Sequence, residues 1–264
     1  MGENRGPLDS QVIVVTGGGQ GLGQSISHKL SALGAVVVIA DINVDSARQA
    51  ADELTADGGR SLAIACDISD PDSVAAARVT VEEAFSRCDG LVNNAGILPK
   101  ASLELETLDG WDRMMNVNLR GAFLATQQFG AMMREQGSGS IVNIGSIGGT
   151  VPTPDAGAYC VSKAGILALA RQTALEWGPY GIRANAVSPG YMETPMTRDR
   201  YAEPGVREQR SAMVPLRRIA DPEDVAGAVV FLMTPEASYI SGQEILVDGG
   251  FKLSTTSRMA QPKP

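Results

Sequence analysis

The chain has 264 residues, of which 44% are hydrophobic and 20% charged, which is enough apolar material for one large α/β domain. Its net charge of −8 and the lack of a basic stripe argue against a nucleic-acid partner. The single histidine and three cysteines without metal-ligand spacing predict no metal site.

No targeting or membrane-spanning segment is predicted. The longest strongly apolar run, residues 35–40, is far too short to cross a bilayer, and residues 1–10 lack the apolar stretch of a signal peptide. Cys88 and Cys160 are expected to be packed free thiols, which suits a reducing compartment. We therefore expect a cytoplasmic protein without a membrane partner.

Short β-branched runs alternate with amphipathic segments along almost the whole chain. The expected strands are 12–15, 36–39, 63–65, 91–92, 141–144, 184–187 and 245–247, and the expected helices are 22–33, 46–57, 72–86, 108–135, 158–178 and 222–233. This alternation predicts right-handed crossovers. The fold class is thus a single doubly wound Rossmann-type α/β domain, with a seven-stranded, mainly parallel sheet and helices on both faces.

The domain is expected to include residues 1–264, with its core at about 10–251. Residues 191–216 interrupt the alternation with a long polar stretch, which predicts a lid over the site. Residues 254–264 are expected to form a mobile tail. Ser46 with Gln49 fits a capping box for the second helix, and Asp221 followed by Pro222 predicts the start of the last one.

A glycine-rich loop follows the first strand and leads directly into a helix. Its spacing fits GxxxGxG on Gly17, Gly21 and Gly23, in the segment Thr16-Gly17-Gly18-Gly19-Gln20-Gly21-Leu22-Gly23. Glycines allow positive φ angles and close approach of a ligand to the backbone. The helix N-terminus offers free N–H groups to a phosphate, so the loop predicts a pyrophosphate site for a dinucleotide.

Asp41 ends the second strand, eighteen residues after Gly23. A carboxylate at this place accepts hydrogen bonds from the adenosine ribose hydroxyls and repels a 2′-phosphate by roughly 1 to 4 kcal/mol. No Arg or Lys lies in the glycine loop or at positions 42–44 to bind that phosphate. Because Ser46 is expected to cap the next helix, Asp41 is interpreted as a ribose ligand, and the predicted cofactor is NAD.

Tyr159 and Lys163 are four residues apart, and in a helix this spacing places both side chains on one face. Lowering the pKa of a tyrosine from about 10 to about 7 takes roughly 4 kcal/mol. One positive charge at about 4 Å supplies roughly that much at an effective dielectric constant of about 20. These magnitudes permit a tyrosine general base for alcohol oxidation at neutral pH, and the alternative for the pair alone is a half-buried packing tyrosine.

Further motifs follow in order: Asn93-Asn94-Ala95-Gly96 after the fourth strand, Asn118 in the fourth helix, Ser146 after the fifth strand, and Ser188-Pro189-Gly190 after the sixth, with Thr194 close behind. Together with the glycine loop and the Tyr159 and Lys163 pair, this ordered set resembles the short-chain dehydrogenase/reductase family over about residues 10 to 251. The resemblance implies an oxidoreductase that moves a hydride between a nicotinamide cofactor and an alcohol or ketone.

The resemblance also implies roles for individual residues. The catalytic residues are Asn118, which holds a water relay, Ser146, which binds the substrate oxygen, Tyr159, the acid/base, and Lys163, which lowers the pKa of that tyrosine and holds the nicotinamide ribose. The cofactor-binding residues are Thr16, Gly17, Gln20, Gly21, Leu22, Gly23, Asp41, Asp67, Ile68, Asn94, Ala95, Gly96, Tyr159, Lys163, Pro189, Gly190 and Thr194. Family members commonly form homotetramers through the fourth and fifth helices and the last strand.

The substrate class stays open between two alternatives. The first is a secondary alcohol or ketone of the polyol, sugar or cyclic-alcohol type, and the second is a 3-oxoacyl group on an acyl-carrier protein. Asp41 and the acidic chain favour the first, as do Gly137 and Tyr180, where the carrier-dependent reductases place basic residues. A non-catalytic dinucleotide-binding regulator is a more remote alternative, since all four catalytic positions are filled.

The expected lid offers apolar residues and arginines to a substrate. Arg198, Arg200, Arg207 and Arg210 alternate with acidic residues at helical spacing. They are interpreted as a solvated helix face, with contact to an anionic substrate as the alternative.

Overall fold

The computed structural model describes residues 6–99 and 101–258, and seven strands of this part form one sheet. The strands are β1 (Val12–Thr16), β2 (Val36–Asp41), β3 (Arg60–Ala65), β4 (Gly90–Asn93), β5 (Gly139–Ile144), β6 (Ile182–Pro189) and β7 (Glu244–Val247). Their order is β3-β2-β1-β4-β5-β6-β7, and every neighbouring pair is parallel. The predicted doubly wound fold is confirmed.

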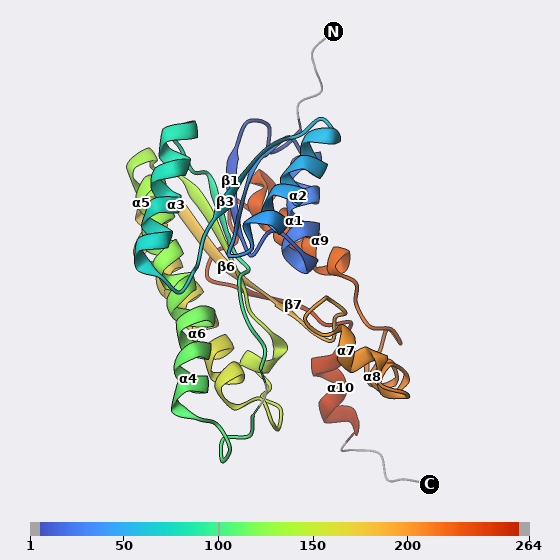
Figure 1. The fold of residues 1–264 in the computed structure, drawn as a ribbon. Helices are drawn as coiled ribbons and strands as arrows, with labels where there is room; N and C mark the ends of the chain where they lie inside the picture. Colours follow the sequence, from blue (N-terminus) through green and yellow to red (C-terminus); the bar gives the residue numbers. More distant parts are fainter. Residues whose placement is uncertain (1–5, 100, 259–264) are drawn as a thin grey trace.

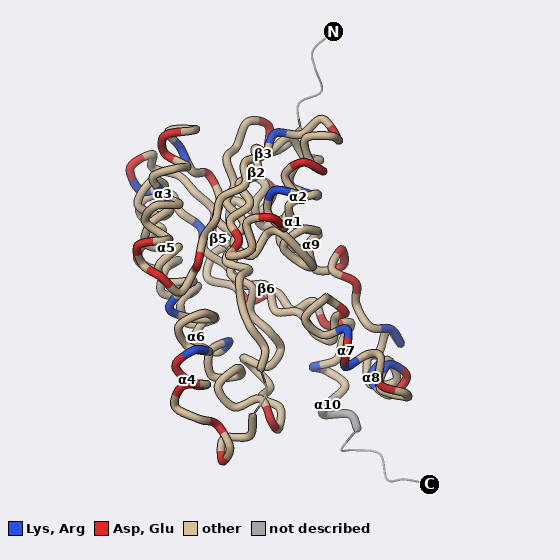
Figure 2. Tube along the Cα trace, in the orientation of Figure 1, with Lys and Arg blue, Asp and Glu red and all other residues tan. Residues whose placement is uncertain are grey.

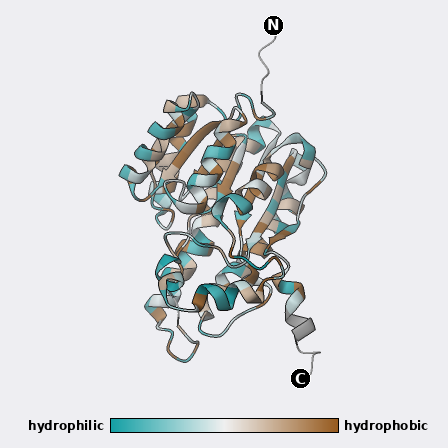
Figure 3. Ribbon diagram, turned by 90° about the vertical axis from the view of Figure 1, so that its right-hand side faces the viewer, coloured by the Kyte–Doolittle hydropathy of each residue, from teal (hydrophilic) through white to brown (hydrophobic). Residues whose placement is uncertain are grey.

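Helices cover both faces of the sheet, as Figure 1 shows. One face carries α1 (Gly21–Ala32), α2 (Val44–Ala56) and α9 (Pro222–Met233), and the other carries α3 (Pro71–Phe85), α5 (Gly121–Gln136) and α6 (Gly157–Trp177). The sheet separates two apolar cores, because successive side chains of a strand point to opposite faces. In Figure 3 the strands are accordingly hydrophobic along their length, whereas hydrophilic residues lie on the outer helices.

The strand order places a topological switch between β1 and β4. The chain leaves β1 toward β2 and β3 on one side and later continues from β4 toward β7 on the other. Crossovers that diverge in this way open a crevice at the carboxyl ends of the strands, where doubly wound proteins bind ligands. The register aligns Asp41 of β2 with Ala65 of β3, so Asp41 and the residues that follow Ala65 share that edge.

The second helix begins earlier than its sequence predicted, so the Ser46 capping box is wrong. The helix α2 starts at Val44, and the side chain of Asn43 accepts hydrogen bonds from the backbone N–H groups of Asp45 and Ser46. Asn is as good an N-cap as Ser, and this choice adds two residues to the helix. At the last predicted helix, Asp221 and Pro222 do start α9, with a capping box completed by Asp224.

The long helix expected at 108–135 is divided by a π-helical turn. It consists of α4 (Leu108–Met115), the π turn η1 (Asn116–Arg120) and α5. Short 3-10 turns follow β5 (η2, Ile147–Gly149), α6 (η3, Gly178–Tyr180) and α9 (η4, Pro235–Ala237). A π turn inside an α-helix changes the direction of the side chains beyond it and is frequent at functional sites.

The expected lid and the first residues of the expected tail contain helices. Residues 191–216 include α7 (Arg198–Ala202) and α8 (Val206–Met213). The expected tail starts within α10 (Phe251–Arg258), which continues through residues 254–258, while the rest of that tail lies outside the described residues. No helix in the described part of the chain is long and apolar enough to cross a membrane.

Candidate functional site

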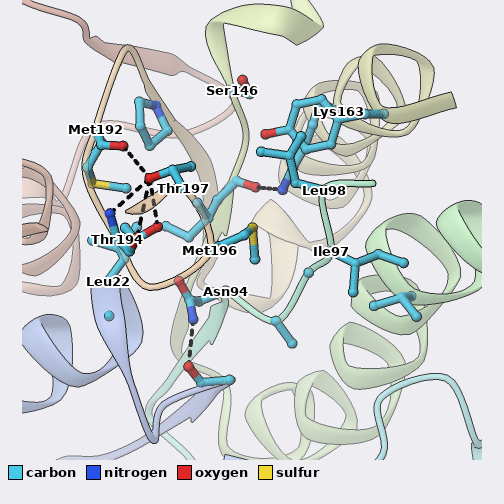
Figure 4. A pocket seen from close by; sticks show the side chains of 18 of the residues that line it. Leu22, Asn94, Ile97, Leu98, Ser146, Lys163, Met192, Thr194, Met196 and Thr197 are labelled. Carbon is cyan, nitrogen blue, oxygen red and sulfur yellow. Dashed lines mark hydrogen bonds between the residues drawn. The ribbon is translucent and has the colours of Figure 1, made fainter. Parts of the chain in front are cut away.

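A cavity of about 940 Å³ lies at the carboxyl ends of the strands. Its wall is formed by the loops after β1, β2, β3, β4, β5 and β6, by α6 and by the segment of α7 and α8. In Figure 4, Ser146 and Lys163 face Met192, Thr194 and Thr197 across it. A volume near the upper end of the usual range for small-molecule sites suits an extended ligand.

Nearly all the residues predicted from the sequence line this one cavity. They are Thr16, Gly17, Gln20, Gly21, Leu22, Asp41, Asp67, Ile68, Asn94, Ala95, Gly96, Ser146, Tyr159, Lys163, Pro189, Gly190 and Thr194. The two exceptions, Gly23 and Asn118, lie directly behind the wall: a Cβ at Gly23 would meet the Gly17 carbonyl, and Asn118 binds the backbone of Ile97. The fold thus gathers residues that are spread over about 180 positions of the sequence.

The glycine loop has the geometry of a phosphate cradle. Gly17 and Gly21 adopt φ angles of +62° and +57°, which side chains rarely allow. A Cβ at Gly23 would lie 2.1 Å from the Gly17 carbonyl oxygen, so only glycine permits this close turn. The helix α1 starts at Gly21, and the side chain of Gln20 does not cap it. The first N–H groups of the helix therefore point to the cavity and fit a pyrophosphate.

Asn94 and Thr16 connect this loop to the end of β4. The amide of Asn94 donates to the carbonyl oxygens of Thr16 at 3.0 Å and Gly17 at 2.9 Å. The Thr16 hydroxyl donates to the Val92 carbonyl and accepts from the N–H of Asn94. Both residues line the cavity, but these contacts show that their polar atoms hold the wall together, so we assign them a positioning role.

Asp41 is 6% exposed and faces the same end of the cavity. Its two oxygens accept from the backbone N–H groups of Gly19 and Asn43, both at 3.0 Å. Each carboxylate oxygen has a second lone pair, so the group can still accept from a ligand. The N-cap of α2 is Asn43, so neither Asp41 nor Ser46 caps this helix.

Asp67 and Ile68 form the neighbouring wall after β3. One Asp67 oxygen accepts from both the backbone N–H, at 2.9 Å, and the hydroxyl, at 2.7 Å, of Ser69. Ile68 is buried against Gly121, where a Cβ would lie 2.8 Å from the isoleucine side chain. The pair presents one polar and one apolar side chain, a combination that fits a nucleobase.

Tyr159, Ser146 and Lys163 meet at the opposite end of the cavity. Tyr159 and Lys163 are one turn apart on α6, and the ammonium lies 5.8 Å from the centre of the phenol ring. The hydroxyl of Ser146 hydrogen-bonds Tyr159 and accepts the N–H of Gly148 at 3.1 Å. A Cβ at Gly148 would lie 3.4 Å from that hydroxyl and 3.7 Å from the tyrosine ring, so glycine keeps the space between them open.

The electrostatics of this end differ from the expectation in one respect. Burial raises the pKa of Tyr159, and the hydrogen bond from Ser146 offsets part of this rise. The ammonium of Lys163 donates to the Ile144 carbonyl at 2.8 Å and lies 5.8 Å from the centre of the phenol ring. Because burial outweighs the hydrogen bond with Ser146, the pKa of the phenol stays above its ordinary value instead of falling toward 7 as expected. Burial itself lowers the pKa of Lys163 to about 8.

Asn118 supports this end from the π turn. It is buried, accepts from the N–H of Ile97 at 2.8 Å and donates to the Ile97 carbonyl at 3.0 Å. A Cβ at Gly96 would lie 3.2 Å from the Asn118 oxygen and 3.8 Å from the Lys163 nitrogen. The asparagine therefore fixes the loop after β4 next to the lysine.

Known proteins match this chain over almost its whole length. A family model described as Enoyl-(Acyl carrier protein) reductase matches residues 17–252. A crystal structure of a short-chain type dehydrogenase/reductase from Mycobacterium marinum superposes with a TM-score of 0.88 at 30% identity, covering 92% of this chain and 96% of that one. The chain belongs to the short-chain dehydrogenase/reductase family.

Two curated members of the family illustrate its chemistry. The 2,5-dichloro-2,5-cyclohexadiene-1,4-diol dehydrogenase LinX of Sphingobium indicum is 35% identical over 93% of this chain and 98% of its own length. The 3-oxoacyl-[acyl-carrier-protein] reductase of a Synechocystis species is 38% identical over 92% and 97%. The protein is therefore an oxidoreductase of the alcohol dehydrogenase and ketoreductase type, whose chemistry uses a nicotinamide cofactor. The glycine cradle described above fits such a cofactor.

Several residues that line the cavity are not among those predicted from the sequence. Arg200 and Arg210 belong to its wall, so the interpretation of all four lid arginines as a solvated face is wrong for these two. Arg198 is exposed, and Arg207 forms an ion pair with Glu193. Helical spacing shows which residues share a face, but the direction of that face depends on how α7 and α8 pack. The other missed residues include Ile97, Leu98, Ile147, Thr153 and Arg113.

Proposed function

We propose that the protein is an NAD-dependent dehydrogenase that oxidises a secondary alcohol, of the polyol, sugar or cyclic type, reversibly to a ketone. The observation that carries this proposal is the single cavity, which joins the glycine cradle and Asp41 at one end to Tyr159, Ser146 and Lys163 at the other. When bound across this cavity, the cofactor accepts or supplies the hydride.

The catalytic roles follow from the contacts at the second end. Tyr159 is the general acid/base, since this half-buried residue lines the cavity and its hydroxyl hydrogen-bonds that of Ser146. Ser146 orients the substrate oxygen next to the phenol. A raised pKa keeps the phenol protonated near neutral pH, so it can donate a proton to a ketone oxygen, and alcohol oxidation should become faster as the pH rises.

Lys163 and Asn118 support the proton transfer. The buried ammonium places a positive charge beside the phenol and donates to the Ile144 carbonyl, and further N–H bonds are left for a ribose hydroxyl or a water molecule. Asn118 holds the adjoining loop and is proposed to keep a water relay to the lysine. These roles rest on the positions of the side chains and on the family resemblance.

The preference for NAD is supported by the charge at the adenosine end. The carboxylates that line the described cavity are those of Asp41 and Asp67, both at that end. A 2′-phosphate close to Asp41 would meet a like charge, with a cost of about 1 to 4 kcal/mol. Asp67 and Ile68 are proposed to contact the adenine, and Pro189, Gly190 and Thr194 the nicotinamide.

Reduction of a 3-oxoacyl thioester is the second candidate, because the Synechocystis reductase is a close relative. One local contact also favours it: the guanidinium of Arg134 lies 4.7 Å from the ring centre of Tyr180, at the place where such reductases carry basic residues. A single exposed arginine is a weak docking surface for an acidic carrier, so we rank this function second.

The assembly, the lid and the location of the protein stay predictions. We propose a homotetramer through α5, α6 and β7, which is supported by the exposed Phe123 and Leu175 on these helices and by the position of β7 at the edge of the sheet. Residues 191–216 are proposed to act as the lid, because α7 and α8 form one wall of the cavity. The free cysteines agree with the proposed cytoplasmic location.

Steady-state kinetics on the purified protein tests the proposal. Cyclic secondary alcohols and polyols are offered with NAD⁺ and with NADP⁺, and 3-oxoacyl thioesters with NADH and with NADPH. We expect turnover of at least one alcohol class with a preference for NAD⁺. Turnover confined to the thioesters with NADPH would replace the first function by the second, and no turnover of either class would overturn both.

A further inference from the structure

The charges that line the cavity are not evenly distributed. Its acidic side chains belong to the adenosine end, where Asp41 is the last residue of β2 and Asp67 follows β3. Lys163 belongs to the opposite, catalytic end, and among the described residues the wall also contains Arg113, Arg200 and Arg210 but no carboxylate besides Asp41 and Asp67. The chain as a whole is acidic, with a net charge of −8, so a positive cavity end is a local feature.

The position of Arg210 is fixed by aromatic contacts. Its guanidinium lies 5.1 Å from the ring centre of Tyr191 and 5.0 Å from that of Tyr201. Tyr191 packs against Phe251, with ring centres 4.8 Å apart, and belongs to the same apolar cluster as Ile147. Because Ile147 follows Ser146 directly, this chain of contacts places Arg210 at the catalytic end of the cavity and away from the glycine loop.

Ring contacts leave the donors of Arg210 available. A guanidinium that stacks on an aromatic ring uses its face, and its N–H groups point outward in the plane. No carboxylate in the described part of the chain pairs with Arg210 or with Arg200. Two other arginines of this region do have such partners, since Arg207 pairs with Glu193 and Arg218 with Asp224.

Both arginines belong to the segment that forms one wall of the site. Arg200 is half-buried on α7, directly before the buried Tyr201, and Arg210 is half-buried on α8. Figure 2 shows that α7 and α8 carry charges of both signs, yet only these two arginines of the two helices line the cavity. Two partly desolvated cations at one wall fit a ligand with an anionic group.

We propose that the substrate carries a carboxylate, which Arg210 and Arg200 bind while the secondary alcohol or ketone lies at Tyr159. The preferred substrate is thus a hydroxy acid or keto acid. This inference rests on the proposed dehydrogenase function and adds its substrate class. A planar guanidinium matches a carboxylate with two parallel hydrogen bonds, so arginine suits this task better than lysine.

Matched substrates test the inference. The rates for 3-hydroxycyclohexane-1-carboxylate are compared with those for the corresponding carboxamide, which has a similar shape and no charge. We expect kcat/KM for the acid to exceed that for the amide at least about tenfold, mainly through a lower KM, since one charge-assisted hydrogen bond has that order of effect. Equal values for acid and amide in the wild-type protein would overturn the inference.

Variants then assign the effect to the arginines. Arg210→Gln and Arg200→Gln should each lower kcat/KM for the acid at least about tenfold more than for the amide, and Arg210→Lys should restore part of the loss. Arg198→Gln is the matched control, because Arg198 is exposed on α7 and does not line the cavity. Weaker NADH binding in the Arg210 variant, without loss of acid preference, would show that it binds the cofactor and would overturn the inference.

A binding measurement separates this inference from the proposed function. If no alcohol is turned over, the dehydrogenase proposal fails, and cyclohexanecarboxylate is titrated against the protein with NADH bound, followed by nicotinamide fluorescence. Binding of this acid that is stronger than that of cyclohexanecarboxamide, and is weakened in Arg210→Gln, would still support an anion site. Equal binding of the acid and the amide would overturn the proposed anion site.

Discussion

Lys163 is a buried cation, and its replacement by methionine tests the energetic cost of a charge at this position. Burial lowers the pKa of this amine from its ordinary 10.5 to about 8. A difference of this size corresponds to a destabilisation of the folded state by about 3 kcal/mol near neutral pH, where both states are protonated. The hydrogen bond to the Ile144 carbonyl offsets part of that cost.

The sign of the pH dependence follows from the direction of the shift. Between the two pKa values the unfolded chain binds a proton at this amine and the folded protein does not, so stability rises with pH. From about pH 7 to about pH 9.5, this group should add about 2 kcal/mol to the free energy of unfolding. A methionine cannot titrate, so the variant lacks this increase.

We therefore expect cofactor-free Lys163→Met to be more stable than the wild-type protein by about 1 kcal/mol near pH 7, after subtraction of the lost hydrogen bond. Because the wild-type protein gains about 2 kcal/mol over this pH range, the advantage should become a disadvantage of about 1 kcal/mol near pH 9.5, while turnover is lost at every pH. Urea unfolding of both proteins at one protein concentration measures the difference. A stability difference that stays constant across this pH range would refute the assignment of a buried, charged lysine.

Two further predictions concern the cofactor end of the cavity. Asp41→Asn should raise the ratio of kcat/KM for NADP⁺ to that for NAD⁺ at least about tenfold. The control variant Asp45→Asn, which changes an exposed side chain, should leave this ratio unchanged. An unchanged ratio in Asp41→Asn would show that Asp41 does not determine the choice of cofactor. Gly23→Ala puts a Cβ 2.1 Å from the Gly17 carbonyl oxygen. NADH should therefore bind to this variant at least about tenfold more weakly than to the control variant Gly227→Ala, whose added Cβ meets open space. Equal binding by both variants would contradict the pyrophosphate role of the loop.

The sheet could be predicted because its strands are buried on both faces. Every residue of β1 and β2 is buried, so these strands read as continuous apolar runs. β3 has exposed ends at Arg60 and Ala65 and only partly buried residues between Arg60 and Ile64. Only its last three residues were predicted as a strand. The strand order does not follow from apolar runs, since it depends on which crossover goes to which side.

The site residues were predictable where the backbone geometry requires a particular residue type. They were less predictable where tertiary packing determines whether a side chain reaches the cavity. Gly17 and Gly23 are required by a positive φ angle and a close approach, and both are recognisable from spacing. Arg210 enters the cavity because its side chain lies over two tyrosine rings, a contact that no local pattern shows. The pKa of Tyr159 likewise depends on its burial and on its hydrogen bond with Ser146, and neither can be predicted from the sequence.

The central claim is that the hydroxyl of Tyr159 transfers the proton while the cofactor site is independent of it. Tyr159→Phe removes that one oxygen and keeps the ring, so a single preparation can be assayed for turnover and for NADH binding. We expect kcat to fall at least about a hundredfold, the scale of a lost general acid/base, while the NADH dissociation constant stays close to that of the wild-type protein. A variant that keeps most of its turnover, or that loses NADH binding together with turnover, would contradict it.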